Sequence, residues 1–141
     1  MATAAWPVQR ALYAALVALP GLAGEPGPGV VAIYDEPPED APKPYVVLGE
    51  LDEQADDAHD RQGIDAGITL HVWSAYRGFR EIAGIFVQLD TALDRKPIEI
   101  PGLVDVSIAA VSKTLQRDPD PDLRHGVARY RIWATTTDSI T

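Results

Sequence analysis

Cysteine is absent from the chain, which excludes disulfides, thiolate metal sites and cysteine nucleophiles together. Positive charge is scarce as well, because 12 lysine and arginine residues stand against 21 aspartate and glutamate residues. The formal net charge is therefore −9. Phosphate backbones and anionic membrane surfaces repel such a chain, which argues against nucleic-acid binding or membrane binding through overall charge.

Motifs of nucleotide binding and hydrolysis are also missing. No Walker loop, no G-x-G-x-x-G and no G-x-S-x-G occurs. The stretch "GEPGPG", residues 24–29, places prolines where a phosphate cradle needs free backbone N–H groups. The three histidines, His59, His71 and His125, lack the i, i+3 or i+4 spacing of helical metal ligands. We expect no enzymatic activity, no metal and no cofactor.

What the chain does contain is typical of one folded domain. It has 141 residues, of which 46% are hydrophobic and 23% are charged. This length supports a single core, and the composition is far from that of disordered chains. We therefore expect one domain over residues 1–141.

The N-terminal segment is predicted to be an amphipathic helix over residues 7–19. Its apolar stripe consists of Val8, Leu12, Ala15, Leu16 and Leu19. Pro20-Gly21 ends the helix. A secretory signal, with Arg10 before the apolar residues 11–23, is the alternative, but no clean small-residue cleavage site follows. The stretch is also too short to span a bilayer.

Prolines and glycines divide the rest of the chain into strands and one further helix. Strands are expected at residues 30–35, 45–51, 65–74, 97–100, 101–117 and 124–136. A period of 3.6 residues predicts a second helix over residues 79–94. Its apolar face consists of Phe79, Ile82, Ala83, Phe86, Leu89 and Leu93. The order predicts an α+β fold, in which two amphipathic helices pack on one face of a largely antiparallel sheet.

Alternation assigns the strand faces. The inward residues expected in the strand at 65–74 are Ala66, Ile68, Leu70 and Val72. In the strand at 101–117 they are Val104, Val106, Ile108 and Ala110. In the last strand they are Gly126, Ala128, Tyr130, Ile132 and Ala134. His71 and His125 then lie on the outward faces, where they can meet across the sheet but are expected to be ordinary, half-exposed surface histidines.

A dense acidic run follows the strand at 45–51. Six acids fall within eleven positions: Glu50, Asp52, Glu53, Asp56, Asp57 and Asp60. We interpret the run as the loop of a long hairpin, either a simple solvated tip or an element that faces a lumen or a neighbouring subunit. Catalytic carboxylates need desolvation, which a polar loop does not provide.

The outward face of the last strand has the opposite sign. Arg129, Arg131 and Trp133 share it. Arginine and tryptophan are enriched at the centres of protein interfaces. These three residues are therefore predicted to form a subunit interface.

Four stretches together resemble a known family. They are "QRALYAALVA", "VAIYDEPPEDAPKPYVVLGE", the strand "ITLHVWS" followed directly by a helix, and the closing "LQRDPDPDLRHGVARYRI". In this order they are similar to the tail-completion family of long-tailed bacteriophages and gene transfer agents, which comprises tail terminators and tail-to-head joining proteins. The similarity covers nearly the whole chain, and none of its parts is a catalytic signature.

This resemblance implies a structural virion protein that forms a ring, commonly a homohexamer, at the head-proximal end of the tail tube. The ring stops tube polymerisation and joins the tail to the neck proteins of the head. The implied partners are further copies of the chain, the tail tube protein and the neck protein, while DNA passes through the lumen without specific binding. Assembly takes place in the bacterial cytoplasm. The alternatives are a head-closure or neck ring component, and a small α+β ligand-binding domain or enzyme.

Overall fold

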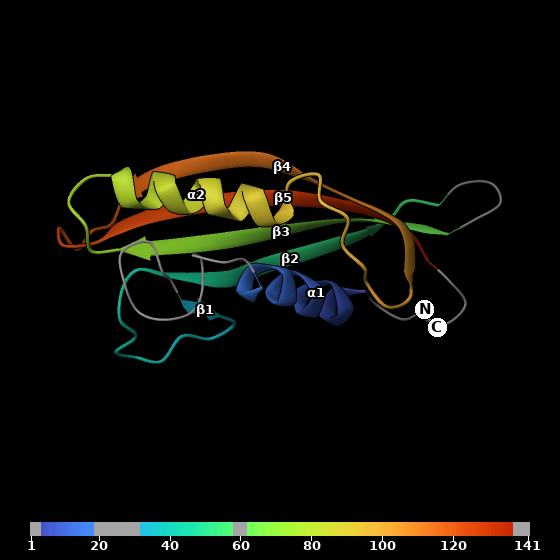
Figure 1. Cartoon of the computed structure of the whole chain (residues 1–141), viewed down its shortest axis with the longest axis horizontal. Coiled ribbons are helices and arrows are strands. Elements are labelled where there is room, and N and C mark those ends of the chain that lie inside the picture. Colours follow the sequence, from blue (N-terminus) through green and yellow to red (C-terminus); the bar gives the residue numbers. More distant parts are fainter. Residues whose placement is uncertain (1–3, 19–31, 58–61, 137–141) are drawn as a thin grey trace.

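Two helices cover one face of a five-stranded sheet, and both contribute to a single apolar core (Figure 1). The computed structural model describes residues 4–18, 32–57 and 62–136. In chain order the elements are α1 (Ala5–Val17), β1 (Ala32–Tyr34), β2 (Tyr45–Ala55), β3 (Gly63–Ser74), α2 (Arg80–Leu93), β4 (Leu103–Arg117) and β5 (Arg124–Thr136). The sheet order is β1-β2-β3-β5-β4. Only β1 and β2 pair in parallel, so the predicted α+β class is confirmed.

The sheet is built around β3 and β5, which pair along their whole length from Gly63 opposite Thr135 to Ser74 opposite Arg124. Both strands alternate as predicted. Their inward side chains are buried: Ala66, Ile68, Leu70, Val72, Ala128, Tyr130, Ile132 and Ala134. Because one face packs on the helices and the other does not, a period of two residues is the expected signal.

Helix α1 packs on the side of β1 and β2. Val8, Leu12 and Leu16 are fully buried, as the amphipathic pattern predicted, whereas the predicted Leu19 lies outside the described residues. The helix begins at Ala5, two residues before the predicted start. The carboxylate of Glu53, from β2, accepts a hydrogen bond of 2.7 Å from the backbone N–H of Ala4. A carboxylate at this position stabilises the positive end of the helix dipole.

Helix α2 packs over the other half of the sheet, against β3, β5 and β4. Its buried side chains are Ile82, Ile85, Phe86, Leu89 and Leu93. Ala83, which was predicted to face the core, is exposed. The helix approaches β5 closely at Gly126, where a Cβ atom would lie 2.5 Å from Ile82 and 2.8 Å from Phe86. Within this layer the buried Tyr130 hydroxyl donates a hydrogen bond of 2.6 Å to Asp90, which satisfies it.

Strand β2 is longer than predicted, because the acidic residues Asp52 and Glu53 belong to it as well as Glu50. A register shift between Leu48 and Leu51 accompanies the change from apolar to acidic sequence. Beyond this bulge the strand still pairs with β3 through Ala55, so the interpretation of residues 52–55 as part of a loop was wrong. Acidic side chains are compatible with a strand here because only one of its faces packs on helices.

Strand β4 also departs from the predicted alternation. Register shifts between Val104 and Ser107 and between Ala110 and Ser112 interrupt its pairing with β5. As a result Leu103 is buried and Val104 is exposed, while Ile108 is buried as predicted. A bulge adds one residue to one strand and so reverses the face on which later side chains lie.

Two expected strands are shorter or absent. The first spans only residues 32–34 instead of 30–35. The segment 97–100 is not a strand, although Ile100 is buried and its carbonyl accepts a hydrogen bond from the N–H of Leu103. Pro97 and Pro101 have no N–H group to donate to a sheet. None of the helices in the described ranges is long and apolar enough to cross a membrane.

The close approach of α2 to β5 predicts the sign of two substitutions. Gly126→Ala should lower the free energy of unfolding by about 1–3 kcal/mol, because the added methyl group displaces Ile82 and Phe86. Gly84→Ala, on the exposed side of α2 with no atom within 4 Å of the new Cβ, should raise it by about 0.5–1 kcal/mol. Urea unfolding of both variants measures these changes. Equal effects at the two glycines would contradict the packing described.

Candidate functional site: the helix-free face of the sheet

The face of the sheet opposite the helices, here called the open face, carries most of the residues that the sequence singled out. Its side chains come mainly from β2, β3 and β5, and include Asp52, Gln54, Asp65, Thr69, His71, Trp73, His125, Arg129, Arg131 and Trp133. Polar, charged and aromatic groups are mixed on it. The open face is therefore the natural candidate for a functional surface.

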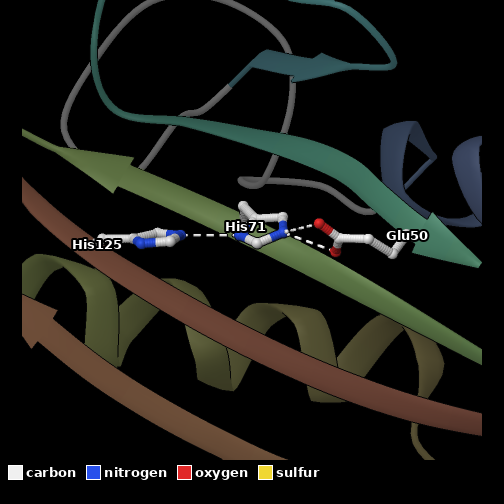
Figure 2. Close-up of polar contacts among 3 residues, drawn as sticks. All are labelled: Glu50, His71 and His125. Atoms are coloured by element: carbon white, nitrogen blue, oxygen red, sulfur yellow. Dashed lines mark hydrogen bonds and ion pairs between the residues drawn. The ribbon is translucent and has the colours of Figure 1, made fainter.

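A chain of polar contacts crosses the open face from β2 to β5 (Figure 2). His71 Nε2 lies 2.9 Å from the carboxylate of Glu50, and His71 Nδ1 lies 2.8 Å from Nε2 of His125. The ring of Trp73 stacks on that of His125 at a centroid distance of 4.0 Å and an interplanar angle of 2°. Two residues that were expected to be separate surface histidines thus form one cluster.

Register and a glycine bring these groups together. His71 pairs with Val127, while Trp73 pairs with His125, so the two histidines are diagonal neighbours on adjacent strands. On the other side, a Cβ atom at Gly49 would lie 2.6 Å from the imidazole of His71. Glycine at this position leaves the ring free to lie over β2 and reach Glu50.

The cluster accommodates a limited number of protons. A carboxylate only accepts hydrogen bonds, so Nε2 of His71 donates to Glu50, and in the neutral ring Nδ1 accepts from Nε2–H of His125. Since one proton occupies the space between the two facing nitrogens, the histidines cannot both be fully protonated in this geometry. Burial, and next the charge of His71, lower the pKa of His125. The hydrogen bond from His71 lowers the pKa of Glu50.

The three residues of the predicted interface lie on the open face as expected, but they differ in what they contact. Arg131 forms a two-bond ion pair with Asp65 on β3, in which its Nε lies 3.1 Å from Oδ1, and its guanidinium lies 5.1 Å from the Trp133 ring. Arg129 forms no ion pair with any described residue. A hollow of about 270 Å³ lies beside both arginines, bordered also by Asp52 and Asp65. Among the described residues Arg129 is therefore the free cation of this face, in that no carboxylate bonds to it directly, although its charge contributes to the lowered pKa of Glu50.

The six acids of the predicted loop do not act as one group. Glu50 binds His71, Glu53 binds the start of α1, and Asp57 accepts a hydrogen bond of 3.2 Å from the N–H of Gly63. Asp52 lies over Gly67, Asp56 is exposed near the tip, and Asp60 lies outside the described residues. Only some of these carboxylates remain available to a partner.

Sequence reasoning missed the contacts of Trp73, Asp65 and the two histidines, although alternation placed all four on the outward face. Alternation does not give the register that pairs them. Among the described residues no group of three or more histidine, aspartate or glutamate side chains is arranged to hold a metal ion. What the open face offers chemically is hydrogen bonding, charge and flat aromatic surface, which are the means of recognition.

The lowered pKa of His125 makes stability depend on pH. The unfolded chain takes up a proton near the ordinary histidine pKa, whereas the folded protein does so only at lower pH. The free energy of unfolding should therefore fall as the pH decreases from about 7 through the ordinary histidine pKa. The lowered pKa of Glu50 extends the loss to more acidic pH. Urea unfolding at several pH values should show a weaker pH dependence for His125→Gln than for the wild type, and an unchanged one for the neighbouring Gln116→Ala. Equal pH profiles for His125→Gln and the wild type would contradict it.

Comparison with known proteins identifies the family of the chain. Among curated proteins no sequence relative is found. In solved structures, the fold is similar to that of a chain in the virion of a native gene transfer agent particle, with a TM-score of 0.76 and 22% sequence identity over 94% of this chain and 98% of that one. The family model for tail completion protein gp17 matches residues 10–135. Its proteins are structural and not enzymatic, as the sequence predicted. The chain belongs to the tail completion protein gp17 family.

Proposed function

We propose that the protein is a tail terminator: copies of it form a ring, a homohexamer, on the head-proximal end of the tail tube, where the ring stops polymerisation and joins the tube to the neck of the head. The observation that carries this proposal is the family match across residues 10–135, which is nearly the whole chain. The fold shared with a chain of a gene transfer agent virion supports it.

The open face supplies the groups for contact with a neighbouring subunit. Arg129 is exposed and has no acid partner in the described part of its own subunit, so an acid of a neighbour can bind it. Trp133, held against Arg131, adds flat apolar surface next to it. Arg131 is already neutralised by Asp65 and contributes packing more than charge. Such pairs favour correct register over raw affinity.

The remaining acids of the hairpin have a second role in this proposal. Glu50 keeps three quarters of its side chain exposed although it binds His71, and Asp52, Asp56 and Asp57 are exposed too. Facing the lumen, these carboxylates repel the phosphates of packaged DNA, so that DNA passes without binding. Glu53 is excluded from this role because it binds the start of α1.

A tube-capping experiment tests the function directly. Tail tubes polymerised from the tube protein of the same particle are mixed with the purified protein, and tube lengths and ends are examined by electron microscopy. A terminator shortens the tubes and forms a ring at one end. Unrestricted growth with bare ends would refute the proposal, and binding to isolated heads in place of tubes would identify a neck component.

Reversing the free cation should impair capping. Arg129→Glu should keep the monomer folded, because the residue is exposed, and should raise the concentration that caps half of the tubes at least about tenfold. Arg77→Glu, an equal charge change in the exposed loop before α2, is the control. Capping by Arg129→Glu at the wild-type concentration would remove Arg129 from the interface.

The tip of the β2–β3 hairpin should be needed for assembly and not for folding. Replacing residues 57–62 with Asn-Gly retains the paired residues Ala55 and Ile64, and closing a shorter loop changes the free energy by about 1 kcal/mol or less. Unfolding should thus remain cooperative while capping or DNA passage decreases. If the shortened protein fills particles with DNA as well as the wild type does, the acidic tip has no part in assembly.

A further inference from the structure

Most of the exposed large apolar side chains lie on α1, or on α2 and β4. Among the described residues there are eight of them: Trp6, Tyr13 and Val17 on α1, and Tyr76, Val87, Val104, Val111 and Leu115 in the loop before α2, on α2 or on β4. None lies on β2, β3 or β5. Since α1 covers the β1 side of the sheet and α2 the β4 side, the two groups lie at opposite edges (Figure 1). Exposed apolar surface of this kind marks places where a subunit contacts another molecule.

The first strip, here called the α1 flank, consists of Trp6, Arg10, Tyr13 and Val17 on the outer side of α1. Their spacing of four, three and four residues places them in one line along the helix, opposite the buried Val8, Leu12 and Leu16. Trp6 is 60% exposed. The strip borders a hollow of about 430 Å³ that also includes Asp35 and Leu48. Tryptophan, arginine and tyrosine are the residues that contribute most to binding at protein interfaces.

The second strip, here called the β4 flank, consists of Val87 on α2 with Leu115 and Arg117 on β4, whereas Val111 borders the hollow beside Arg129 on the open face. Val87, 63% exposed, lies on the side of α2 where Asp90 binds Lys113 and Asp94 binds the N–H of Ala110. Strand β4 is the edge of the sheet. From residue 111 to residue 117 its outer backbone has no partner in the described part of the chain. An edge of this length is normally covered or protected by charge.

We propose that the α1 flank of one copy packs against the β4 flank of the next copy, and that this head-to-tail contact is the seam of the ring. The proposal rests on the terminator function. One contact of this kind covers both apolar strips, whereas a symmetric contact between two α1 flanks would leave every β4 flank exposed. A head-to-tail contact repeats, so it closes into a ring when the rotation between copies divides a full turn.

Charge supports the same pairing. Asp35 and Glu36 follow β1 beside the α1 flank. Arg117 belongs to the β4 flank, and Arg80 begins α2. None of these four residues forms an ion pair with a described residue. Opposite charges across the seam offset the repulsion between copies whose net charge is −9. Residues 106–109 of β4 border a hollow of about 470 Å³, which is also lined by Arg95, Lys96 and Trp133. The open-face contact proposed above therefore adjoins this seam.

Cross-linking on tube ends tests the pairing, and the absence of native cysteine makes it specific. A chain with both Trp6→Cys and Leu115→Cys, assembled on tubes and treated with a short bis-maleimide reagent, should give a ladder of covalent oligomers. Each single variant should remain monomeric, because in a head-to-tail contact neither flank meets a second copy of itself. The pair Val17→Cys with Val87→Cys repeats the test at two further exposed positions.

The outcomes separate this inference from the function on which it rests. Capped tubes that give no ladder with either pair, or covalent dimers from Trp6→Cys alone, would overturn the head-to-tail seam but leave the terminator intact. Failure of the wild type to cap tubes would overturn the function itself. Tyr13→Glu and Leu115→Glu should each raise the half-capping concentration at least about tenfold. Capping by both variants at the wild-type concentration would also overturn the seam.

Discussion

All apolar packing between helices and sheet takes place on one face, and the rest of the molecule depends on this constraint. Helix α2 reaches the centre of the sheet only because Gly126 has no side chain to separate Ile82 and Phe86 from β5. With α1 beside it, one apolar layer is complete. The opposite face of β3 and β5 then needs no further cover for folding, and its residues are free to serve recognition.

The sequence predicted those elements in which one signal acts alone. Alternation in β3 and β5 and the helical period of α2 were correct to within two residues at each end, since each reports burial on one side. The prediction from sequence failed where a second constraint acted on the same residues. The extension of β2 was not predicted because its residues are acidic, and composition does not distinguish an acidic strand from a loop. In the structure Glu53 faces α1 and Asp52 faces solvent. Because of the bulges in β4, Leu103 is buried in place of the predicted Val104. No local sequence signal marks where a strand gains a residue.

The candidate site shows the same limit at the level of side chains. Alternation placed Arg129, Arg131 and Trp133 together, because residues two apart on a strand share a face. It did not show that Asp65 neutralises Arg131, or that His71 and His125 are hydrogen-bonded to each other, because both contacts join strands whose register comes from the whole sheet. Charged residues that looked equivalent along the chain thus divide into those used within the subunit and those left for a partner.

This division bears on how a strongly acidic chain can assemble with itself. At −9 per copy, the proposed ring concentrates negative charge, and long-range repulsion grows with every subunit added. Solvent ions screen that repulsion beyond about 10 Å, so short-range contacts decide whether a ring forms. Cations that form no ion pair with a described residue, such as Arg129 and Arg117, can then bind acids of a neighbour without first breaking an ion pair of their own. Apolar strips supply the attraction, while charge selects which edge meets which. A surface arranged in this way favours a closed ring, in which both edges of every copy are covered, over a dimer, in which two edges stay exposed.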